Sequence, residues 1–576
     1  MRFGAPCSAR PLRTRKLFML SSPLRRWLLG LLTLLMLLGV GYWSIGGRMG
    51  VMLMMVKYAI RQDYGPTQEV RWAKPPSPPV TGTVEKRPNI ILIVADDLGF
   101  NDITAHGGGV AQGTVPTPNI DSLAKNGVDF LAGYSGNATC APSRAAMMTG
   151  RYPTRFGFEF TPTPKQFMKV LASNGSPNEM EKPIYHAERE ADLIPYEDMG
   201  LPVQEVTLAR ALKNSGYRTL QLGKWHLGDS PQFRPYAHGF DESLSLMHGA
   251  SMFLPENSPQ VVNSKQEFDA IDKFLWAAHP WGIRFNAGEP FQPPRYMTDY
   301  LTDEAIKAID ANKQNPFFMY LAYNAPHSPL QATREDYDAL PHISDHATRV
   351  YAAMIRSLDR NIGRVLQHLK AQGLDDNTMI IFTSDNGGAH YIGVPDLNKP
   401  YRGWKATFYE GGIRVPFFMK WPKGLPSGTQ FKQPISHLDV FTTALAAAQA
   451  APPQGKVLDG VNLLPFAKGL NAQAPHEQLF FRTDTYLALR KGDWKLQVME
   501  RPKQDVLYNL AADPGERNNL ASQEPERLAD MKKRLSDINA QQIKPMWPSL
   551  AEAAISLDKT LKQAPKPGDS YIYYAN

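Results

Sequence analysis

The unbroken aliphatic run Ile90–Val94 limits the folds open to this chain more than any other sequence feature. A strand that is apolar at every position is buried on both faces, as in a parallel sheet with helices on either side. Further apolar runs follow at Thr219–Leu222, Phe317–Ala322, Met379–Thr383 and Phe417–Lys420. Helical patterns alternate with them at Ile120–Lys125, Ser143–Met148, Val206–Ser215, Asp299–Asn312 and Thr348–Gln372. This alternation predicts an α/β fold with a large mixed, mainly parallel sheet sandwiched by helices.

The pattern changes after about residue 475, where short strand patterns replace the long alternation. Three of them precede a charged helical pattern at about Pro525–Ile538: Gln478–Phe481, Tyr486–Arg490 and Trp494–Val498. The turn Lys491-Gly-Asp493 between the last two is typical of a hairpin. We therefore predict a main catalytic domain over residues 86–474, a small C-terminal antiparallel α+β domain over residues 475–545 and a tail over residues 546–576.

The net charge of +8 is concentrated at the N-terminus. Residues 1–72 hold eleven Lys or Arg and two acids, which leaves a net charge of −1 on the rest of the chain. A nearly neutral body argues against nucleic-acid binding. The uncharged, Leu-rich residues 27–47 are long enough to cross a hydrocarbon layer of ~30 Å. The positive-inside rule then predicts a basic cytoplasmic segment over residues 1–26, a transmembrane anchor over residues 27–47 and a linker over residues 48–85.

A cleaved signal peptide is the alternative to this membrane anchor. The apolar run is long for a signal peptide and no clear small-x-small cleavage site follows it, so we expect the anchor to remain. The two cysteines, Cys7 and Cys140, lie on opposite sides of the predicted membrane, which excludes a disulfide within the exported part. A large exported domain without disulfides favours the bacterial periplasm.

The most specific stretch of the sequence begins at Cys140 and reads Cys-Ala-Pro-Ser-Arg-Ala-Ala-Met-Met-Thr-Gly-Arg151. It resembles the sulfatase signature C-x-P-S-R-x-x-x-x-T-G at every fixed position. Six fixed residues coincide by chance with a probability of ~10⁻⁸ per starting position at average amino-acid usage. The resemblance extends over roughly residues 86–540, and it implies a sulfuric ester hydrolase of the arylsulfatase type within the alkaline phosphatase superfamily.

The resemblance implies that a formylglycine-generating enzyme, which reads the Cys-x-Pro-x-Arg core, oxidises Cys140 to formylglycine (3-oxoalanine). The hydrated aldehyde offers one hydroxyl as nucleophile and a second through which sulfate is eliminated, so one hard step becomes two easier ones. A helix after Cys140 would direct its N-terminal N–H groups at the anion. Arg144, one turn further on, would stabilise the hydrate or the sulfate. The alternative is an unmodified Cys140 packed as a small apolar residue.

Polar residues at two predicted strand ends indicate a metal site. Asp96 and Asp97 follow the first strand, and Asp385 and Asn386 follow Met379–Thr383. By themselves both pairs are typical of turns. The resemblance assigns them, together with the oxidised Cys140, to one Ca²⁺, with Mg²⁺ possible, because these ions prefer oxygen ligands. The ion would lower the pKa of the attacking hydroxyl, and Asp385 would take its proton.

Four further residues carry the resemblance. Lys224 and His226 stand in Gly223-Lys-Trp-His-Leu-Gly228, His327 stands in Ala325-Pro-His-Ser-Pro-Leu330, and Lys405 follows Gly403-Trp. The resemblance makes Lys224 and His327 sulfate contacts and His226 the base that releases sulfate. Either His327 or Lys405 would protonate the leaving oxygen, and the sequence leaves this choice open. Cations gathered here would stabilise the charge that develops in the transition state.

Two regions are candidate rims of the substrate cleft. One is the long stretch Phe156–Val203, for which a surface decoration is the alternative. The other spans Asp229–Arg295 and contains six aromatic or cationic residues that suit a sulfated sugar or belong to the core: Arg234, His238, His248, Trp276, Trp281 and Arg284. Besides a sulfatase for aryl or carbohydrate esters, the sequence leaves two functions open. They are a phosphoester or phosphonate hydrolase of the same superfamily and a catalytically silent, membrane-tethered binding protein.

Overall fold

The computed structural model describes residues 22–44, 47–55, 57–58, 64–75, 87–173, 175–279 and 281–576. The chain divides into two compact units, residues 1–60 and 61–576. In the first unit, helix α1 spans Ser22–Ser44 and helix α2 spans Gly47–Met55. Within the described residues, no helix combines the length and the apolar character that a membrane crossing needs. The anchor over residues 27–47, part of which lies outside the described residues, stays a prediction.

The second unit is built around a large sheet, which has ten strands in the described part of the chain. In spatial order they are β14 (Thr429–Phe431), β2 (Val128–Phe130), β13 (Phe417–Lys420), β12 (Thr378–Ser384), β1 (Asn89–Ala95), β10 (Phe317–Ala322), β5 (Arg218–Lys224), β6 (Glu242–Leu246), β8 (Ile283–Phe285) and β9 (Pro290–Phe291). The five strands from β12 to β6 run parallel, whereas β13 and β8 pair antiparallel at their flanks. The prediction of a mixed, mainly parallel sheet is confirmed.

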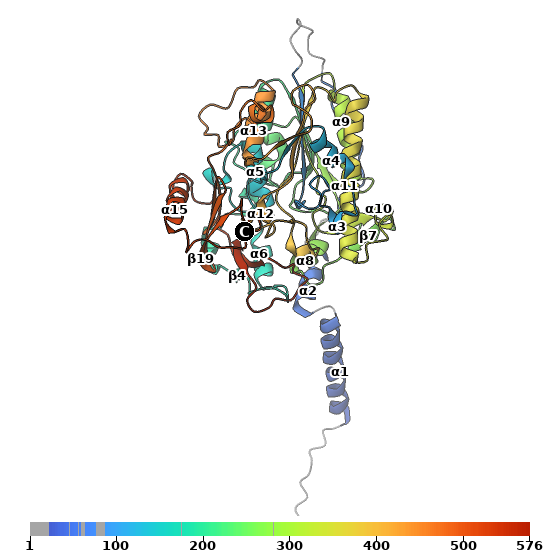
Figure 1. Cartoon of the computed structure of the whole chain (residues 1–576). Helices are drawn as coiled ribbons and strands as arrows, with labels where there is room; N and C mark the ends of the chain where they lie inside the picture. Colours follow the sequence, from blue (N-terminus) through green and yellow to red (C-terminus); the bar gives the residue numbers. More distant parts are fainter. Residues whose placement is uncertain are drawn as a thin grey trace, which may run out of the picture. The chain divides into compact units, whose positions relative to one another are not determined.

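Helices cover both faces of this sheet, which explains why β1 is apolar at every position. Ile91 and Ile93 pack into the core beneath α9 (Met297–Asn312) and α11 (His346–Ala371). Ile90 and Leu92 pack into the opposite core, beneath α5 (Cys140–Thr149) and α13 (Leu438–Ala447). Figure 1 shows these two helix pairs on opposite sides of the central strands. Side chains alternate between the faces of a strand, so two buried faces require an uninterrupted apolar run.

The remaining elements are shorter or lie at the edges of the unit. The helices are α3 (Val110–Gly113), α4 (Pro118–Lys125), α6 (Lys165–Ser173), α7 (Leu208–Asn214), α8 (Ala270–Ala278), α10 (Arg334–Asp338), α12 (Glu410–Ile413) and α14 (Leu464–Ala467). The strands are β3 (Gly133–Tyr134), β7 (Val261–Ser264), β11 (Leu330–Thr333) and β15 (Ile435–Ser436).

A small antiparallel sheet follows the main sheet, as predicted. Its strands are β16 (Gln478–Thr483), β17 (Tyr486–Lys491), β18 (Trp494–Glu500) and β19 (Lys503–Asn509). Helix α15 (Pro525–Asn539) packs Met531 and Leu535 against one face of this sheet. The other face packs against Phe408 and Tyr409, which belong to the main domain. Strand β19 was not predicted, because its first three residues, Lys-Gln-Asp, are polar.

Residues 546–576, predicted as a tail, contain strands β20 (Ala551–Ser556) and β21 (Tyr571–Ala575). Strand β20 pairs with β21 and with β4 (Ile184–Tyr185), which lies inside the long stretch Phe156–Val203. His186 Nε2 lies 2.7 Å from Glu552 Oε1 at this junction. Strand β20 therefore holds part of the stretch Phe156–Val203 in place, through a pairing between segments that are far apart in sequence.

Candidate active site

The carboxyl ends of the parallel strands bring the predicted polar residues to one edge of the sheet. Ala95, the last residue of β1, lies opposite Ser384, the last residue of β12. Asp96 and Asp97 therefore leave the sheet beside Asp385 and Asn386, and the Asp97 amide donates to Asp385 Oδ1 at 3.1 Å. Asp97 adopts a left-handed conformation with φ of 62°, which aspartate tolerates better than most residues. This is the edge where ligands bind in open α/β sheets.

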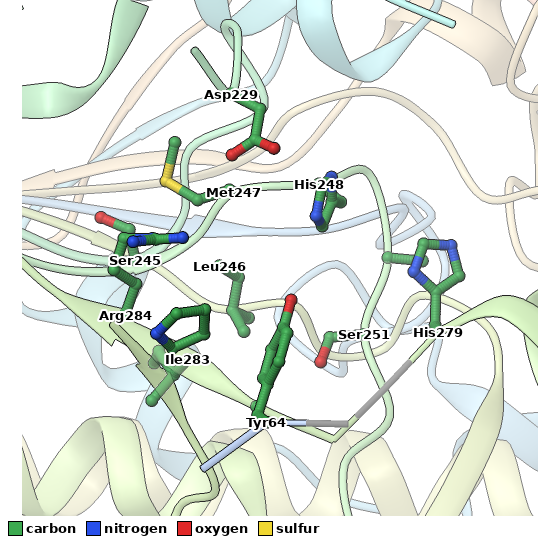
Figure 2. Close-up of a pocket in the computed structure, with 13 residues that line it drawn as sticks. Tyr64, Asp229, Ser245, Leu246, Met247, His248, Ser251, His279, Ile283 and Arg284 are labelled. Carbon is green, nitrogen blue, oxygen red and sulfur yellow. The ribbon is translucent and has the colours of Figure 1, made fainter. Parts of the chain in front are cut away.

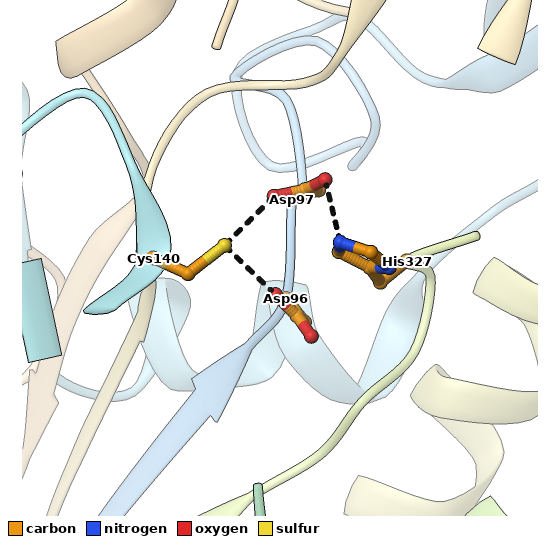
Figure 3. A group of neighbouring side chains, drawn as sticks. All are labelled: Asp96, Asp97, Cys140 and His327. Atoms are coloured by element: carbon orange, nitrogen blue, oxygen red, sulfur yellow. Dashed lines mark hydrogen bonds and ion pairs between the residues drawn. The ribbon is translucent and has the colours of Figure 1, made fainter. Parts of the chain in front are cut away.

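Cys140 is the first residue of α5, and its side chain points at the two aspartates. Its Sγ lies 3.7 Å from Asp96 Oδ1 and 3.7 Å from Asp97 Oδ1. Figure 3 shows the thiol and His327 on opposite sides of this aspartate pair. The residue is only 4% exposed, and burial raises the pKa of its thiol to about 12. The helix N-terminus and the strand ends thus converge on residue 140.

Two buried cations balance the carboxylates. Arg144 Nε and Nη2 lie 2.9 and 2.8 Å from Asp385 Oδ2, and Nη2 lies 3.5 Å from Asp96 Oδ1. Lys224, at the end of β5, places its Nζ 2.7 Å from Asp96 Oδ2. Burial raises the pKa of Asp96 to about 7 in spite of these cations. The edge of the sheet therefore holds two buried cationic side chains, each already paired with a carboxylate, beside residue 140.

A second group of polar atoms surrounds Asp97 Oδ2. Lys405 Nζ lies 2.9 Å from it, the Tyr391 hydroxyl donates to it at 3.1 Å, and His327 Nε2 lies 3.5 Å away. Burial opposes ionisation of Asp97, but Lys405 and His327 hold its pKa well below the usual range. The hydroxyl of Tyr391 also lies 3.1 Å from Lys405 Nζ. Tyr391 was missed by sequence reasoning, because it stands in a short 3₁₀ turn, His390–Ile392, outside every recognised motif.

The hydrogen bonds of His327 define its tautomer. Its Nδ1 lies 2.5 Å from the carbonyl oxygen of Ser328, which can only accept, so Nδ1 carries the proton. The lone pair of Nε2 then faces Lys405 Nζ at 3.4 Å. Burial lowers the pKa of His327 to about 3, although Asp97 acts against this shift. In this arrangement Lys405 holds the transferable proton.

His226 lies on the loop that follows β5 and has a left-handed backbone with φ of 57°. Its Nδ1 is buried and has no hydrogen-bond partner in the described chain. Burial and the charges of Lys224 and Arg144 lower the pKa of His226 well below its usual range, so the imidazole is neutral and able to accept a proton. A side chain at Gly249 would come within 2.8 Å of the His226 ring, so the ring packs directly on the loop after β6.

The oxygen atoms at this edge fit a hard divalent cation. Asp96, Asp97, Cys140 and His327 each offer a ligand atom, and these atoms lie within 4.8 Å of one another. Asn386 donates its Nδ2 to Asp97 Oδ1 at 2.8 Å, and its Oδ1 is buried with no partner among the described residues. An orphaned buried amide oxygen beside two carboxylates is the donor set that Ca²⁺ and Mg²⁺ prefer. Both Asp385 oxygens already accept protein donors.

The candidate rim residues lie in three kinds of place. His238 and Trp276 are buried in the core, and Trp276 donates to Asp272 at 3.0 Å. His248 and Arg284 instead line a cavity beside His226. Arg234 donates to the backbone oxygen of Asp229 at 2.8 Å and so supports the loop after His226.

Comparison with known proteins finds two family models and several sulfatases that this chain resembles. The family model described as "Sulfatase" matches residues 88–450, and that described as "N-sulphoglucosamine sulphohydrolase, C-terminal" matches residues 402–541. N-acetylgalactosamine-6-sulfatase of Canis lupus familiaris is 30% identical over 516 residues, which cover 84% of this chain and 90% of that protein. Steryl-sulfatase of Homo sapiens is 31% identical over 464 residues, which cover 70% and 73%. The crystal structure of Ps i-CgsB in complex with k-i-k-neocarrahexaose has 32% identity and a TM-score of 0.66, covering 80% of this chain and 95% of that one.

Proposed function

The chain belongs to the sulfatase family and is a sulfuric ester hydrolase, and we propose that it releases sulfate from a sulfated carbohydrate by means of an oxidised Cys140. Cys140 carries this proposal, because its side chain lies 3.7 Å from two carboxylates at the N-terminus of a helix. Lys224 and Arg144 supply the positive charge that a sulfate ester needs at the same place.

Cys140 becomes formylglycine through a formylglycine-generating enzyme, which is the partner that maturation requires. Hydrated formylglycine supplies a hydroxyl that attacks sulfur and a second hydroxyl that expels sulfate by elimination. Asp96, Asp97 and Asn386, with the oxygen of residue 140, would hold Ca²⁺ or Mg²⁺, and Asp385 lies at the edge of this set. The ion supplies charge neutralisation at the sulfate oxygens.

The remaining residues bind the anion and move protons. Lys224 and Arg144 hold sulfate oxygens, and Asp385 takes the proton of the attacking hydroxyl. His226 is a neutral imidazole with an unpartnered Nδ1, which suits the base that removes the second hydroxyl proton. Lys405 donates a proton to the leaving oxygen, because the proton of His327 is held by the carbonyl of Ser328. His327 then orients Lys405 and contacts the sulfate.

A carbohydrate is the alcohol that fits best. One similar protein is named for an N-acetylgalactosamine sulfate and a similar structure was solved with a neocarrahexaose. The steryl-sulfatase is similar over less of this chain. The wall next to His226 is polar, with Asp229, His248 and Arg284 on it, which suits sugar hydroxyls and not a sterol.

Mass spectrometry and an activity assay together test this proposal. The chain is produced with a formylglycine-generating enzyme, and the peptide that contains residue 140 is analysed alongside sulfate release from 4-nitrophenyl sulfate. We expect the aldehyde in active protein and no turnover in Cys140→Ala or Cys140→Ser. Active enzyme with an intact thiol at residue 140 would contradict the mechanism.

A phosphate or phosphonate ester is the second candidate substrate, because its tetrahedral oxyanion would meet the same cations. The assay therefore includes 4-nitrophenyl phosphate. If kcat/KM is larger for the phosphate ester than for the sulfate ester, phosphate and phosphonate esters become the proposed substrates.

A further inference from the structure

We propose that the cavity beside His226 binds the sugar that bears the sulfate ester, with Tyr64 and Asp229 as residues that determine specificity. This inference rests on the proposed function. The cavity has a volume of about 90 Å³, several times the space that one water molecule needs. Its walls come from the loop after His226, the loop after β6, the strands β8 and β9, and Tyr64.

The cavity adjoins the loops that surround His226. Asp229 stands three residues after His226, on the loop that leaves β5. His248 and Ala250 line the cavity, and Gly249 between them lies so close to His226 that a side chain there would come within 2.8 Å of the ring. A group bound in the cavity is therefore separated from the catalytic imidazole by the thickness of one residue.

Two polar groups that line this cavity lack partners among the described residues. The Asp229 carboxylate has no hydrogen bond or ion pair within the described residues, and Arg284 Nε is buried without a partner. Figure 2 shows the Asp229 carboxylate and the Tyr64 hydroxyl pointing into the same space from opposite sides. Buried polar atoms normally have a partner, and a few convergent polar groups in a concave site are what fixes a ligand's orientation. Acceptors and donors on opposite walls match the hydroxyls of a sugar ring.

Tyr64 lies outside the part of the chain that the sulfatase model matches. It precedes residue 88, where the match to the sulfatase model begins. Its neighbour Gly65 is held by β9, because Gly65 donates to the Pro290 carbonyl at 3.2 Å and accepts from the Gln292 amide at 2.9 Å. The ring packs so tightly against Gly282 that a side chain there would overlap it, with a Cβ 1.5 Å from Tyr64 Cδ2.

The phenol of Tyr64 stays a hydrogen-bond donor at neutral pH. Burial raises its pKa, and the nearby charge of Asp229 raises it further, while Arg284 acts in the opposite direction. An aromatic ring with a polar tip offers a sugar both a stacking face and a hydrogen bond. The segment that precedes the matched domain therefore supplies one wall of the substrate site.

Kinetics with two kinds of substrate test this inference on the matured, metal-loaded enzyme. The probes are 4-nitrophenyl sulfate, which lacks a sugar, and a panel of carrageenan oligosaccharides and 6-sulfated N-acetylgalactosamine. The variants Tyr64→Phe and Asp229→Asn keep the shape of each side chain. We expect each to lower the ratio of kcat/KM for the sugar to kcat/KM for the aryl ester about tenfold, which is the effect of losing one hydrogen bond to a buried polar group.

Matched controls are Tyr236→Phe and Asp338→Asn, which alter exposed side chains of the same types. Both are expected to leave the ratio within twofold of wild type, and thermal melting verifies that all four variants fold. Unchanged ratios in Tyr64→Phe and Asp229→Asn would overturn the inference. Wild-type enzyme that hydrolyses the aryl ester and none of the sugars would also overturn it while the proposed reaction stands. Matured enzyme that releases sulfate from neither probe would refute the proposed function itself.

Discussion

Lys495 joins the C-terminal sheet to the loop that carries Lys405. Its Nζ lies 2.9 Å from Glu410 Oε1 and 3.0 Å from Glu516 Oε1, and all three side chains are fully buried. Burial opposes ionisation of Glu410, but Lys495 and Arg414 hold its pKa at about 2. We expect Lys495→Met to destabilise the fold, because it leaves a buried carboxylate without its main counter-charge.

The structure sets the size of this effect. Removing one partner of a buried ion pair costs about 3–5 kcal/mol. Unfolding entropy is about 2.1 cal/mol/K per residue. Summed over residues 61–576, this entropy converts a loss of about 3–5 kcal/mol into a decrease of about 3–5 °C in melting temperature. Lys533 provides a matched control, because its side chain is 76% exposed and, among the described residues, forms an ion pair only with Asp537. Lys533→Met is expected to shift melting by less than ~1 °C.

Differential scanning calorimetry measures both variants under identical metal and buffer conditions. A second variant tests the cause: Lys495→Met combined with Glu516→Gln removes the carboxylate that has Lys495 as its counter-charge, while Glu410 keeps its pairing with Arg414, and this variant is expected to recover part of the lost stability. Sulfate release is measured in parallel, and we expect a lower kcat, because Glu410 anchors the loop that positions Lys405. A melting temperature for Lys495→Met within 1 °C of wild type would refute the electrostatic reasoning.

Three further outcomes are expected. EDTA should abolish most sulfate release and Ca²⁺ should restore it; activity that is indifferent to both would remove the metal assignment of Asp96 and Asn386. Tyr574→Phe deletes hydroxyl contacts of 3.1 Å to Thr139, the residue before Cys140, and to Asn137. It should lower kcat about tenfold with little change in KM, and an unchanged kcat would show that the contact does not position residue 140. His476 lies 2.8 Å from Asp439, which raises its pKa above 6.5 although burial acts in the opposite direction. The stabilising effect of the His476–Asp439 pair should be complete below pH 6.5 and should fade as pH rises through the raised pKa. Melting temperatures of wild type and His476→Gln, measured across this pH range, check it. A difference in melting temperature that does not change with pH would contradict this pairing.

The main sheet was predictable because its strands are buried on both faces. The five apolar runs found in the sequence correspond to β1, β5, β10, β12 and β13, each within two residues of the predicted bounds. Burial on both faces leaves no room for polar positions, so these strands are visible without knowledge of their partners. Strand β20 was missed, since it pairs with Ile184–Tyr185, more than 360 residues earlier in the chain, and β21 was missed with it, since β21 pairs with β20.

The candidate site was predictable as far as its residues stand in motifs or at strand ends. The structure brings together Asp96, Asp97, Cys140, Arg144, Lys224, His327, Asp385, Asn386 and Lys405. Tyr391 and Tyr574 were missed, because each is a single tyrosine whose partners come from distant segments. Tyr64 was missed for a related reason: the segment around it is rich in polar residues and proline, and only its contacts with Gly282 and β9 reveal that it is part of the domain.

The burial of residues 140–149 constrains the order of events in biosynthesis. Cys140 is 4% exposed and Arg144 is fully buried, so both ends of the segment that the proposed formylglycine-generating enzyme would read are hidden once the domain has folded. Any oxidising enzyme must reach this peptide while the chain is still open. Slow closure would lengthen the time available for modification, and a chain that folded too early would keep its thiol permanently.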